Sequence, residues 1–314
     1  MGASALPSAA DRGELHVVTG AFGYTGRAIA SRLLAEGKQV RTLVHDPTRV
    51  NPFGDRLTIV PYRFDNLTAL VRSLEGASVF YNTYWIRFPR GRVTFDAAVA
   101  HTRMLIQACQ AAGVSRIVHL SITNPSGDSP LPYFRGKGIL ERAIRESSLS
   151  YAILRPSVIF GLGDILINNI AWFLRHAPVF PIIGNGQYRL QCADVEDVAE
   201  IATRAAEKTD NMVVELVEPE IFTFEGLVRL IADRVRSHAR IIHLPVAVVR
   251  PLLAAAGLVL RDVVLTRDEI TALMSNLLVS PGPPAGRRRF RDWLDEHAPD
   301  LGRTYASELR RHYR

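Results

Sequence analysis

Apolar and polar residues recur with two different periods along the first half of the chain. Short apolar runs, typical of buried strands, alternate with longer stretches in which apolar residues recur every three to four positions, as on one face of a helix. We predict strands over residues 15–19, 40–44, 57–60, 79–82, 116–121 and 151–154, and helices over residues 24–36, 67–74, 97–112 and 136–146. This alternation predicts an α/β fold with a doubly wound parallel sheet that is covered by helices on both faces.

The pattern changes after Arg155-Pro156, where predicted helices outnumber predicted strands. We predict a strand over residues 213–216, helices over residues 165–175, 195–206, 224–236, 247–259 and 268–277, and two short helices from Phe290 onward. Asp194 is a predicted N-cap, and Asn185-Gly186 predicts a hairpin between two short strands. These elements divide the chain into a disordered tail (1–14), the doubly wound core (15–155), and remaining core elements with a small C-terminal lid or substrate-binding subdomain (156–314).

Composition places the chain among ordinary globular proteins. Hydrophobic residues make up 47% and charged residues 22% of the 314 residues, and the net charge is +7. The basic residues are almost all arginines and are spread along the chain, so we expect no nucleic-acid partner. Cys109 and Cys192 form neither a disulfide framework nor a metal-ligand pattern, so we expect no metal and a reducing, cytoplasmic location.

A glycine-rich segment, Thr19-Gly20-Ala21-Phe22-Gly23-Tyr24-Thr25-Gly26, joins the first predicted strand to the first predicted helix. The three glycines permit a tight turn, a close approach of the backbone to a pyrophosphate, and close packing of the helix on the strand. Unpaired N–H groups at a helix N-terminus bind phosphate. A glycine turn without a ligand is the alternative, but the position between strand and helix favours a bound dinucleotide.

The residues after the second strand bear on which dinucleotide binds. An acidic residue at this position favours NAD, and a basic residue favours the additional phosphate of NADP. His45 holds the expected position, Asp46 follows it, and Arg49 lies nearby. We expect NADP through His45 and Arg49, with NAD as the alternative through Asp46.

A second pattern carries acid–base chemistry. Tyr133 and Lys137 are four residues apart, which places them on one face of a helix. A lysine ammonium beside a phenol lowers the phenol pKa, so that the tyrosine exchanges a proton with a hydroxyl or carbonyl. Ser121 and Thr123, at the end of the fifth strand, are the candidate hydroxyl partners. The alternatives are a packed tyrosine with a surface lysine, and solvated residues at a strand end.

Arg155 ends the sixth strand next to Pro156. Two roles are open to its side chain: it faces an anionic substrate, or it pairs with a carboxylate of the lid.

Five segments together resemble the short-chain dehydrogenase/reductase superfamily, in its extended and atypical branches. They are TGAFGYTG (19–26), RIVHLS (116–121), YFRGK (133–137), YAILRPSVIFG (151–161) and VEDVA (195–199). The resemblance covers about residues 15–210. Within the superfamily the chain is most similar to NAD(P)H-binding proteins of the kind that includes the Rossmann-type accessory subunit of respiratory complex I and the sugar-nucleotide epimerases.

The resemblance implies a role for individual residues. Tyr133 would be the acid–base group, and Lys137 would lower its pKa and bind the ribose hydroxyls of the cofactor. The loop of Gly20, Gly23 and Gly26, which also contains Phe22, Tyr24 and Thr25, would hold the pyrophosphate. Asn82 and Thr83 would lie under the nicotinamide ribose, and Pro156 beside the nicotinamide. Asp65 lies near the adenine-contacting position, for which Arg63 competes.

Two positions depart from the pattern of the superfamily. Ala98 stands where many members have an asparagine, and Ile122 stands where the catalytic hydroxyl often lies, so that Ser121 would have to replace it. We therefore consider two functions. The first is an NAD(P)-dependent oxidoreductase or epimerase that acts on a secondary alcohol or ketone of a small molecule. The second is an NAD(P)H-binding sensor or assembly protein without turnover.

A third function is a membrane-surface protein that handles quinone or lipid. It draws on the apolar stretch 246–260 and its basic neighbours. A lid helix that packs on a sheet requires the same apolar residues, so we do not expect a membrane partner.

Overall fold

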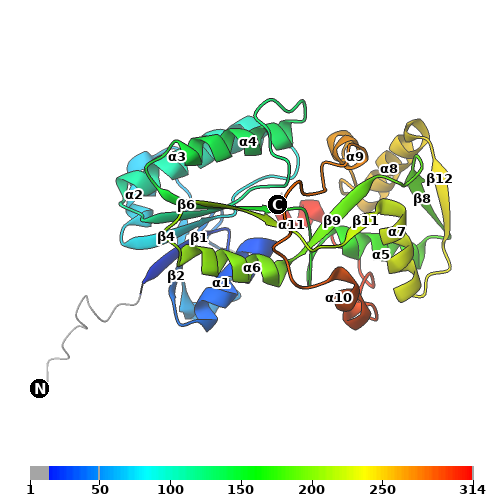
Figure 1. The fold of residues 1–314 in the computed structure, drawn as a ribbon, viewed down its shortest axis with the longest axis horizontal. Helices are drawn as coiled ribbons and strands as arrows, with labels where there is room; N and C mark the ends of the chain where they lie inside the picture. Colours follow the sequence, from blue (N-terminus) through cyan, green and yellow to red (C-terminus); the bar gives the residue numbers. More distant parts are fainter. Residues whose placement is uncertain (1–13, 49, 313–314) are drawn as a thin grey trace, which may run out of the picture. The chain divides into compact units, whose positions relative to one another are not determined.

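The computed structural model describes residues 14–48 and 50–312, in which seven strands form one central sheet (Figure 1). The strand order is β10-β6-β5-β4-β1-β2-β3, in which β1 pairs in parallel with β2 and β4, β2 with β3, and β4 with β5. The strands are β1 (Leu15–Thr19), β2 (Gln39–Val44), β3 (Leu57–Pro61), β4 (Ala77–Asn82), β5 (Arg116–Leu120), β6 (Ser150–Pro156) and β10 (Met212–Leu216). This order confirms the predicted doubly wound sheet. Its direction of winding reverses between β1 and β4, where such sheets bind ligands.

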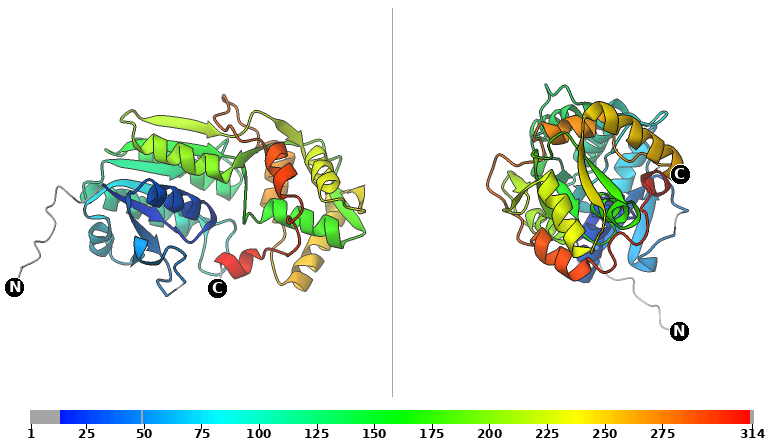
Figure 2. Two further views of the ribbon diagram at one scale, coloured as in Figure 1. Left: turned by 90° about the horizontal axis from the view of Figure 1, so that it is seen from below. Right: turned by 90° about the vertical axis from the view of Figure 1, so that its right-hand side faces the viewer.

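Helices cover both faces of the sheet, as the alternating pattern predicts. α2 (Leu67–Leu74) and α3 (Phe95–Ala111) lie on one face, and α1 (Tyr24–Ala35) and α6 (Val195–Ala206) on the other (Figures 1 and 2). The helix ends follow local chemistry. The Asp194 carboxylate accepts hydrogen bonds from the backbone N–H groups of Glu196 and Asp197, which confirms the predicted N-cap. Gly113, with φ of +72°, follows the end of α3 as predicted.

The chain forms two compact units that exchange segments. The first comprises the chain up to Leu120, Ile139–Ile153 and Ala199–Met212, and the second comprises Ser121–Gly138, Leu154–Val198 and Val213–Arg314. The domain boundary expected at residue 155 stays a prediction, because the units alternate along the chain. Residues 1–13 of the expected tail lie outside the described residues, whereas the Glu14 carboxylate contacts Lys38 Nζ at 3.2 Å.

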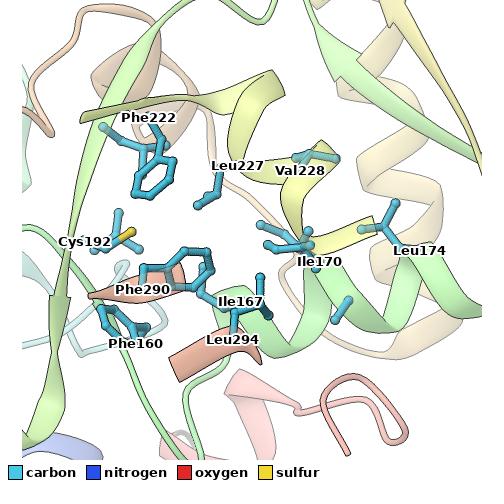
Figure 3. Packing of buried hydrophobic residues seen from close by; sticks show 14 of the residues in the cluster. Phe160, Ile167, Ile170, Leu174, Cys192, Phe222, Leu227, Val228, Phe290 and Leu294 are labelled. Carbon is cyan, nitrogen blue, oxygen red and sulfur yellow. The ribbon is translucent and has the colours of Figure 1, made fainter. Parts of the chain in front are cut away.

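The second unit contains two small sheets and most of the C-terminal helices. β7 (Val158–Phe160), β9 (Arg189–Asp194) and β11 (Ile221–Thr223) form one sheet, and β8 (Val179–Ile183) and β12 (Arg240–Leu244) form the other. Its helices are α5 (Leu166–His176), α7 (Phe224–Arg234), α8 (Val246–Leu260), α9 (Arg267–Met274), α10 (Phe290–His297) and α11 (Glu308–His312). Its core is shown in Figure 3, where Phe160, Phe222 and Phe290 share one cluster with Cys192, Ile167 of α5, Leu227 of α7 and Leu294 of α10. No helix of the described chain is long and apolar enough to cross a membrane.

The hairpin predicted at Asn185-Gly186 is wrong. Gly184 and Gly186 have φ of +59° and +69°, and the Asn185 side chain accepts a hydrogen bond from the Gln187 N–H, so a tight turn forms there. The strands on either side then separate: β8 pairs with β12, whereas β9 pairs with β7 and β11. The predicted turn therefore forms, but it connects strands of two different sheets instead of two strands of one sheet.

A buried arginine ties the first unit together. Arg116 on β5 is 3% exposed, and its guanidinium donates hydrogen bonds to the carbonyls of Ala205 (2.8 Å) and Asp210 (2.9 Å) and to the Ser150 hydroxyl. Burial lowers the pKa of this guanidinium. The side chain thereby satisfies carbonyl groups at the end of α6 and just after it, which follow Arg116 by 89 and 94 residues.

The substitution Arg116→Met should lower the free energy of unfolding by about 3 kcal/mol, because it leaves several buried carbonyl groups without a donor. Arg72→Met, at an exposed position on α2, is the matched control and should change it by less than about 0.5 kcal/mol. Urea unfolding followed by circular dichroism measures both. Equal effects of the two substitutions would show that the Arg116 hydrogen bonds contribute little.

Candidate functional site

The glycine loop of the first unit has a backbone that other residues would disturb. Gly20 has φ of +63°, its N–H donates to the Leu43 carbonyl (2.8 Å), and its carbonyl accepts from the Gly23 N–H (2.8 Å). A Cβ at Gly26 would overlap the Gly20 carbonyl oxygen and lie 3.0 Å from the Thr19 carbonyl oxygen. Two of the glycines therefore serve the roles that the spacing predicts, a turn with positive φ and a close approach of helix to loop.

The N-terminus of α1 fits a phosphate group. Gly23 is the N-cap and no side chain caps the helix there, nor does the first turn contain an acidic residue. Backbone N–H groups at such an end favour an anion, which the helix dipole also stabilises. Phe22, Tyr24 and Thr25 are partly buried in the same loop. The loop therefore fits the pyrophosphate of a dinucleotide.

The end of β4 is locked to the end of β1. The Thr83 N–H donates to Thr19 Oγ1 (2.7 Å), and the Thr83 hydroxyl donates to the Thr19 carbonyl (2.5 Å). The Asn82 amide, fully buried, donates to His119 Nδ1 (3.0 Å) and accepts from the Tyr84 N–H. Thr83 Oγ1 would lie 3.7 Å from a Cβ at Gly20. The structure thus brings Thr83 to the glycine loop, while the Asn82 side chain is used within the protein.

The residues expected at the adenosine end are at the surface. His45 and Asp65 are exposed. The Asp46 carboxylate accepts hydrogen bonds from the Thr48 N–H (2.9 Å) and the Thr48 hydroxyl (2.6 Å), so it stabilises the turn after β2. Arg49 lies outside the described residues.

An aromatic cluster at the ends of β3 and β4 was not predicted. The rings of Phe64 and His101 stack with centroids 3.9 Å apart, and Tyr62 and Tyr84 pack against Phe64. Tyr84 Oη and His101 Nδ1 form a 2.8 Å hydrogen bond. Burial raises the pKa of Tyr84 to about 12 and lowers the pKa of His101. Burial therefore favours the neutral forms of Tyr84 and His101. Aromatic residues directly after two strands were the signal that could have revealed the cluster.

The predicted acid–base pair lies on α4 (Pro132–Arg145) in the second unit. The helix begins four residues before the predicted start, because Pro132 takes the first helical position and the Ser129 hydroxyl accepts from the Leu131 N–H just before it. Tyr133 and Lys137 are therefore both helical and share one face. Lys137 is 3% exposed, and Tyr133 is half-buried.

The loop between β5 and α4 lies directly on this helix. A Cβ at Gly138 would overlap the Gly127 nitrogen and lie 2.8 Å from Ser126 Cα. The Ser126 N–H also donates to the Phe134 carbonyl, in the first turn of α4. The missing side chain at Gly138 thus allows the loop to hold the part of α4 that carries Lys137.

The two candidate hydroxyl groups differ in their partners. Ser121 Oγ is buried and has no hydrogen-bond partner among the described residues. Thr123 Oγ1 donates to Glu215 Oε2 (3.4 Å). Ile122 lies between them in the sequence and packs with Leu131 and Phe134 in an apolar cluster. Ser121 therefore offers the unengaged hydroxyl, and Ile122 serves packing.

Glu215 organises the polar groups near Thr123. Its carboxylate accepts from Arg155 Nη1 (3.0 Å) and from the Ser280 hydroxyl (2.8 Å). Of the two roles left open for Arg155, the structure shows the ion pair with a carboxylate. Pro156 is buried, and its carbonyl accepts from the Thr123 N–H (3.0 Å). Residues 277–279 join this group through the Asn124 amide, which donates to the carbonyls of Leu277 and Val279.

The remaining predicted features lie in the core. Ala98 of α3 is buried in the first unit, so no amide side chain is available at that position. Cys109 and Cys192 are free thiols, and burial raises the pKa of both. Within the described ranges, no three histidine, cysteine or acidic side chains are grouped to hold a metal ion.

Comparisons with known proteins agree with this geometry. A family model described as NAD(P)H-binding matches residues 20–160. Ceramide reductase of Caulobacter vibrioides is 30% identical over 73% of this chain and 73% of its own length. A mitochondrial NADH dehydrogenase (ubiquinone) 1 alpha subcomplex subunit 9 from Arabidopsis thaliana is 27% identical over 85% of this chain and 71% of its own length. Among solved structures, triphenylmethane reductase of Citrobacter sp. with NADP(H) has a TM-score of 0.71 at 18% identity, over 90% of this chain and 99% of its own.

The glycine loop generates a binding prediction. Gly23→Asp places a carboxylate at the N-terminus of α1, where we expect the pyrophosphate, and like charges in contact cost several kcal/mol, so NADPH affinity should fall at least about 100-fold. Gly23→Ala adds a Cβ 3.2 Å from the Gly20 carbonyl oxygen but no charge, and should weaken binding much less. Calorimetry measures the NADPH affinity of both variants and so separates the effect of the added charge from the steric effect of the added Cβ. Unchanged affinity in Gly23→Asp would place the cofactor elsewhere.

Proposed function

Because the chain belongs to the NAD(P)H-binding, atypical branch of the short-chain dehydrogenase/reductase superfamily, we propose that it is a reductase that converts a ketone of a small molecule to a secondary alcohol. One observation carries this proposal. In the second unit, Tyr133 and the buried Lys137 share one face of α4, and the same unit contains the buried, unpartnered hydroxyl of Ser121. Buried polar groups usually have partners, so an unpartnered hydroxyl favours a ligand at that place.

Each of these side chains has a distinct task in the proposed reaction. A bound NADPH would supply the hydride that reduces the carbonyl carbon. Ser121 donates a hydrogen bond to the carbonyl oxygen, and Tyr133 gives that oxygen its proton as negative charge develops on it. The Lys137 ammonium stabilises the phenolate that remains. In the reverse direction Tyr133 accepts the proton of the alcohol.

Reduction is a better proposal than epimerisation for two reasons. The relative from Caulobacter vibrioides, 30% identical over 73% of this chain, is named a reductase. The Arg155 side chain, one of whose two expected roles was to face an anionic substrate, also pairs with Glu215 instead. We therefore propose an uncharged or apolar carbonyl compound as the substrate. A cytoplasmic location of the protein is a separate proposal, which its two free cysteines support.

A second function, binding of NAD(P)H without turnover, has its own support. Ala98 and Ile122 stand at two positions where many members of the superfamily have polar side chains. The Thr123 hydroxyl donates a hydrogen bond to Glu215. The Arabidopsis relative is a subunit of NADH dehydrogenase. In this function the glycine loop binds the dinucleotide, and Tyr133 transfers no proton.

Substitution of the tyrosine separates the two functions. Tyr133→Phe keeps the ring and removes the acid, so kcat should fall by about 10²–10⁴ while NADPH affinity stays within a few-fold. Tyr151→Phe on β6 is the matched control and should keep its activity. Activity is found by following NADPH oxidation with ceramides, aliphatic ketones and sugar nucleotides.

The other outcomes each contradict one part of the proposal. If Tyr133→Phe keeps its activity, the proton comes from another group, and Ser121→Ala is measured next. If the parent protein binds NADPH tightly but oxidises it with no compound of the panel, binding without turnover is the better description.

The choice of cofactor is a separate proposal. We expect NADPH to bind roughly tenfold or more tightly than NADH, because a hydrogen bond to a charged group contributes about 1.5–3 kcal/mol. His45→Ala and Arg49→Ala should each reduce this preference, whereas Asp46→Ala should not increase NADPH affinity further. Fluorescence titration with both cofactors measures the ratio. Equal affinities in the parent protein would assign the ribose to Asp46 instead.

A further inference from the structure

The chain after α9 is fixed by hydrogen bonds from three other parts of the second unit. This is the segment 277–279, whose three successive backbone carbonyls all accept hydrogen bonds. The Asn124 amide, after β5, donates to the first and third carbonyls at 3.0 and 2.6 Å. The second carbonyl accepts from the Ser157 hydroxyl (2.8 Å), between β6 and β7, and from the Gln191 N–H of β9 (2.9 Å). The position of this segment is therefore set by residues that lie far from it in the sequence.

The end of α9 directs the first residue of this segment back onto the helix. Asn276 has φ of +54°, and its N–H donates to the Leu273 carbonyl (3.1 Å). The Leu277 N–H donates to the Ala272 carbonyl, also at 3.1 Å. These two bonds form a Schellman motif, in which the side chain after the left-handed residue packs on the last turn of the helix. Leu277 accordingly packs against the apolar cluster that contains Ala272.

Tyr133 packs against the same cluster from α4. The four buried members of the cluster come from the end of β5, from the start of α4 and from α9: Ile122, Leu131, Phe134 and Ala272. Three half-buried side chains lie against them, those of Tyr133, Leu277 and Leu278. Side chains that are packed at the density of a protein interior fix one another's rotamers. A shift of the 277–279 segment therefore changes the surroundings of the Tyr133 ring.

Asn124 has the conformation and the chemistry that its contacts require. Its φ of +53° is one that asparagine adopts more readily than most other residues. Its amide nitrogen carries two hydrogens, which match two carbonyl acceptors, whereas the carboxylate of an aspartate would donate none. The residue follows Thr123 and lies three positions after Ser121. It thus fixes the 277–279 segment to the part of the chain that carries both candidate hydroxyl groups.

We propose that Asn124 is a positioning residue for the proton transfer by Tyr133. It fixes the 277–279 segment at the end of β5, and this segment completes the packing around the Tyr133 ring. The inference rests on the proposed function, because it concerns the proton that Tyr133 gives to the carbonyl oxygen. In a purely structural role, the same hydrogen bonds would contribute to stability and leave the proton transfer unchanged.

Two substitutions of Asn124 remove its donors and tolerate its backbone conformation. Asn124→Asp keeps the shape of the side chain, and Asn124→Gly adds no charge. Each should lower kcat about 10- to 100-fold, because a displacement of about 1 Å at a reacting group costs up to about 100-fold. NADPH affinity should change much less, since the glycine loop lies in the first unit. In a Tyr133→Phe background neither substitution should lower kcat further, because the group that Asn124 positions is already absent.

Asn169→Asp is the matched control in the same unit. The Asn169 amide donates to the Ala306 carbonyl (2.9 Å) and accepts from the Ala306 N–H (2.9 Å), so it also fixes a distant segment. This variant should lower the thermal unfolding midpoint much as Asn124→Asp does, but it should keep the kcat of the parent. The comparison separates positioning from general destabilisation.

A second measurement requires no activity. In protein that contains fluorotyrosine, the fluorine NMR resonance that Tyr133→Phe removes belongs to Tyr133. We expect this resonance to shift in Asn124→Asp and in Asn124→Gly, because the surroundings of the ring change. It should stay unchanged in Asn169→Asp.

The outcomes separate this inference from the proposed function. If the parent oxidises NADPH with no compound of the panel, the reductase fails, and the Tyr133 resonance alone decides whether Asn124 positions the ring. Three results would overturn the role of Asn124. The first is an unchanged Tyr133 resonance in both Asn124 variants. The second is an equal loss of kcat in Asn169→Asp. The third is an equal loss of kcat with and without the Tyr133 hydroxyl, which would place the effect of Asn124 at another group.

Discussion

Two helices of this protein lie against loops at backbone distance, and each contact requires a helix position without a side chain. Gly26 of α1 meets the carbonyls of Thr19 and Gly20, and Gly138 of α4 meets the backbone of Ser126 and Gly127. Each loop leaves the carboxyl end of a strand, β1 in one case and β5 in the other. The same arrangement thus positions the candidate cofactor loop and the candidate acid–base pair: in each, the loop that follows a strand packs directly on the backbone of a helix. Even one methyl group at either glycine would separate helix and loop.

The features that sequence analysis predicted well are those encoded by neighbouring residues. The strands of the central sheet, the helices between them and the N-cap at Asp194 follow from short patterns, and the structure confirms them. The glycine loop is equally local, and the NAD(P)H-binding family model begins at Gly20. The pairing of Tyr133 with Lys137 on one helix face was also local, although the helix begins earlier than predicted, because the roles of Pro132 and Ser129 as starting signals were missed. The chemical roles of that pair stay predictions.

The features that were missed depend on residues far apart in the chain. Nothing close to Thr123 indicates that its hydroxyl faces Glu215, which follows it by 92 residues and also pairs with Arg155. The hairpin at Asn185-Gly186 failed for the same reason: the turn is local, but the partners of β8 and β9 come from β12, β7 and β11. The exposed apolar residues of α8, among them Leu252 and Val259, show the limit of hydrophobic patterning. Periodicity identifies which residues share a face of a helix, but not whether another part of the protein covers that face.

The hydrogen bonds of Arg116 have a consequence for the order in which the chain matures during synthesis. The guanidinium enters the ribosomal tunnel with β5, but its carbonyl partners at Ala205 and Asp210 are added 89 and 94 residues later. The first unit takes its last segment from Ala199–Met212, after most of the elements around β7, α5, β8 and β9 have been made. A nascent chain of which β5 has emerged from the ribosome therefore contains the Arg116 guanidinium before its hydrogen-bond acceptors have been synthesised. The glycine loop, although it lies among the first thirty residues, belongs to a unit that is completed only when two thirds of the protein has been translated.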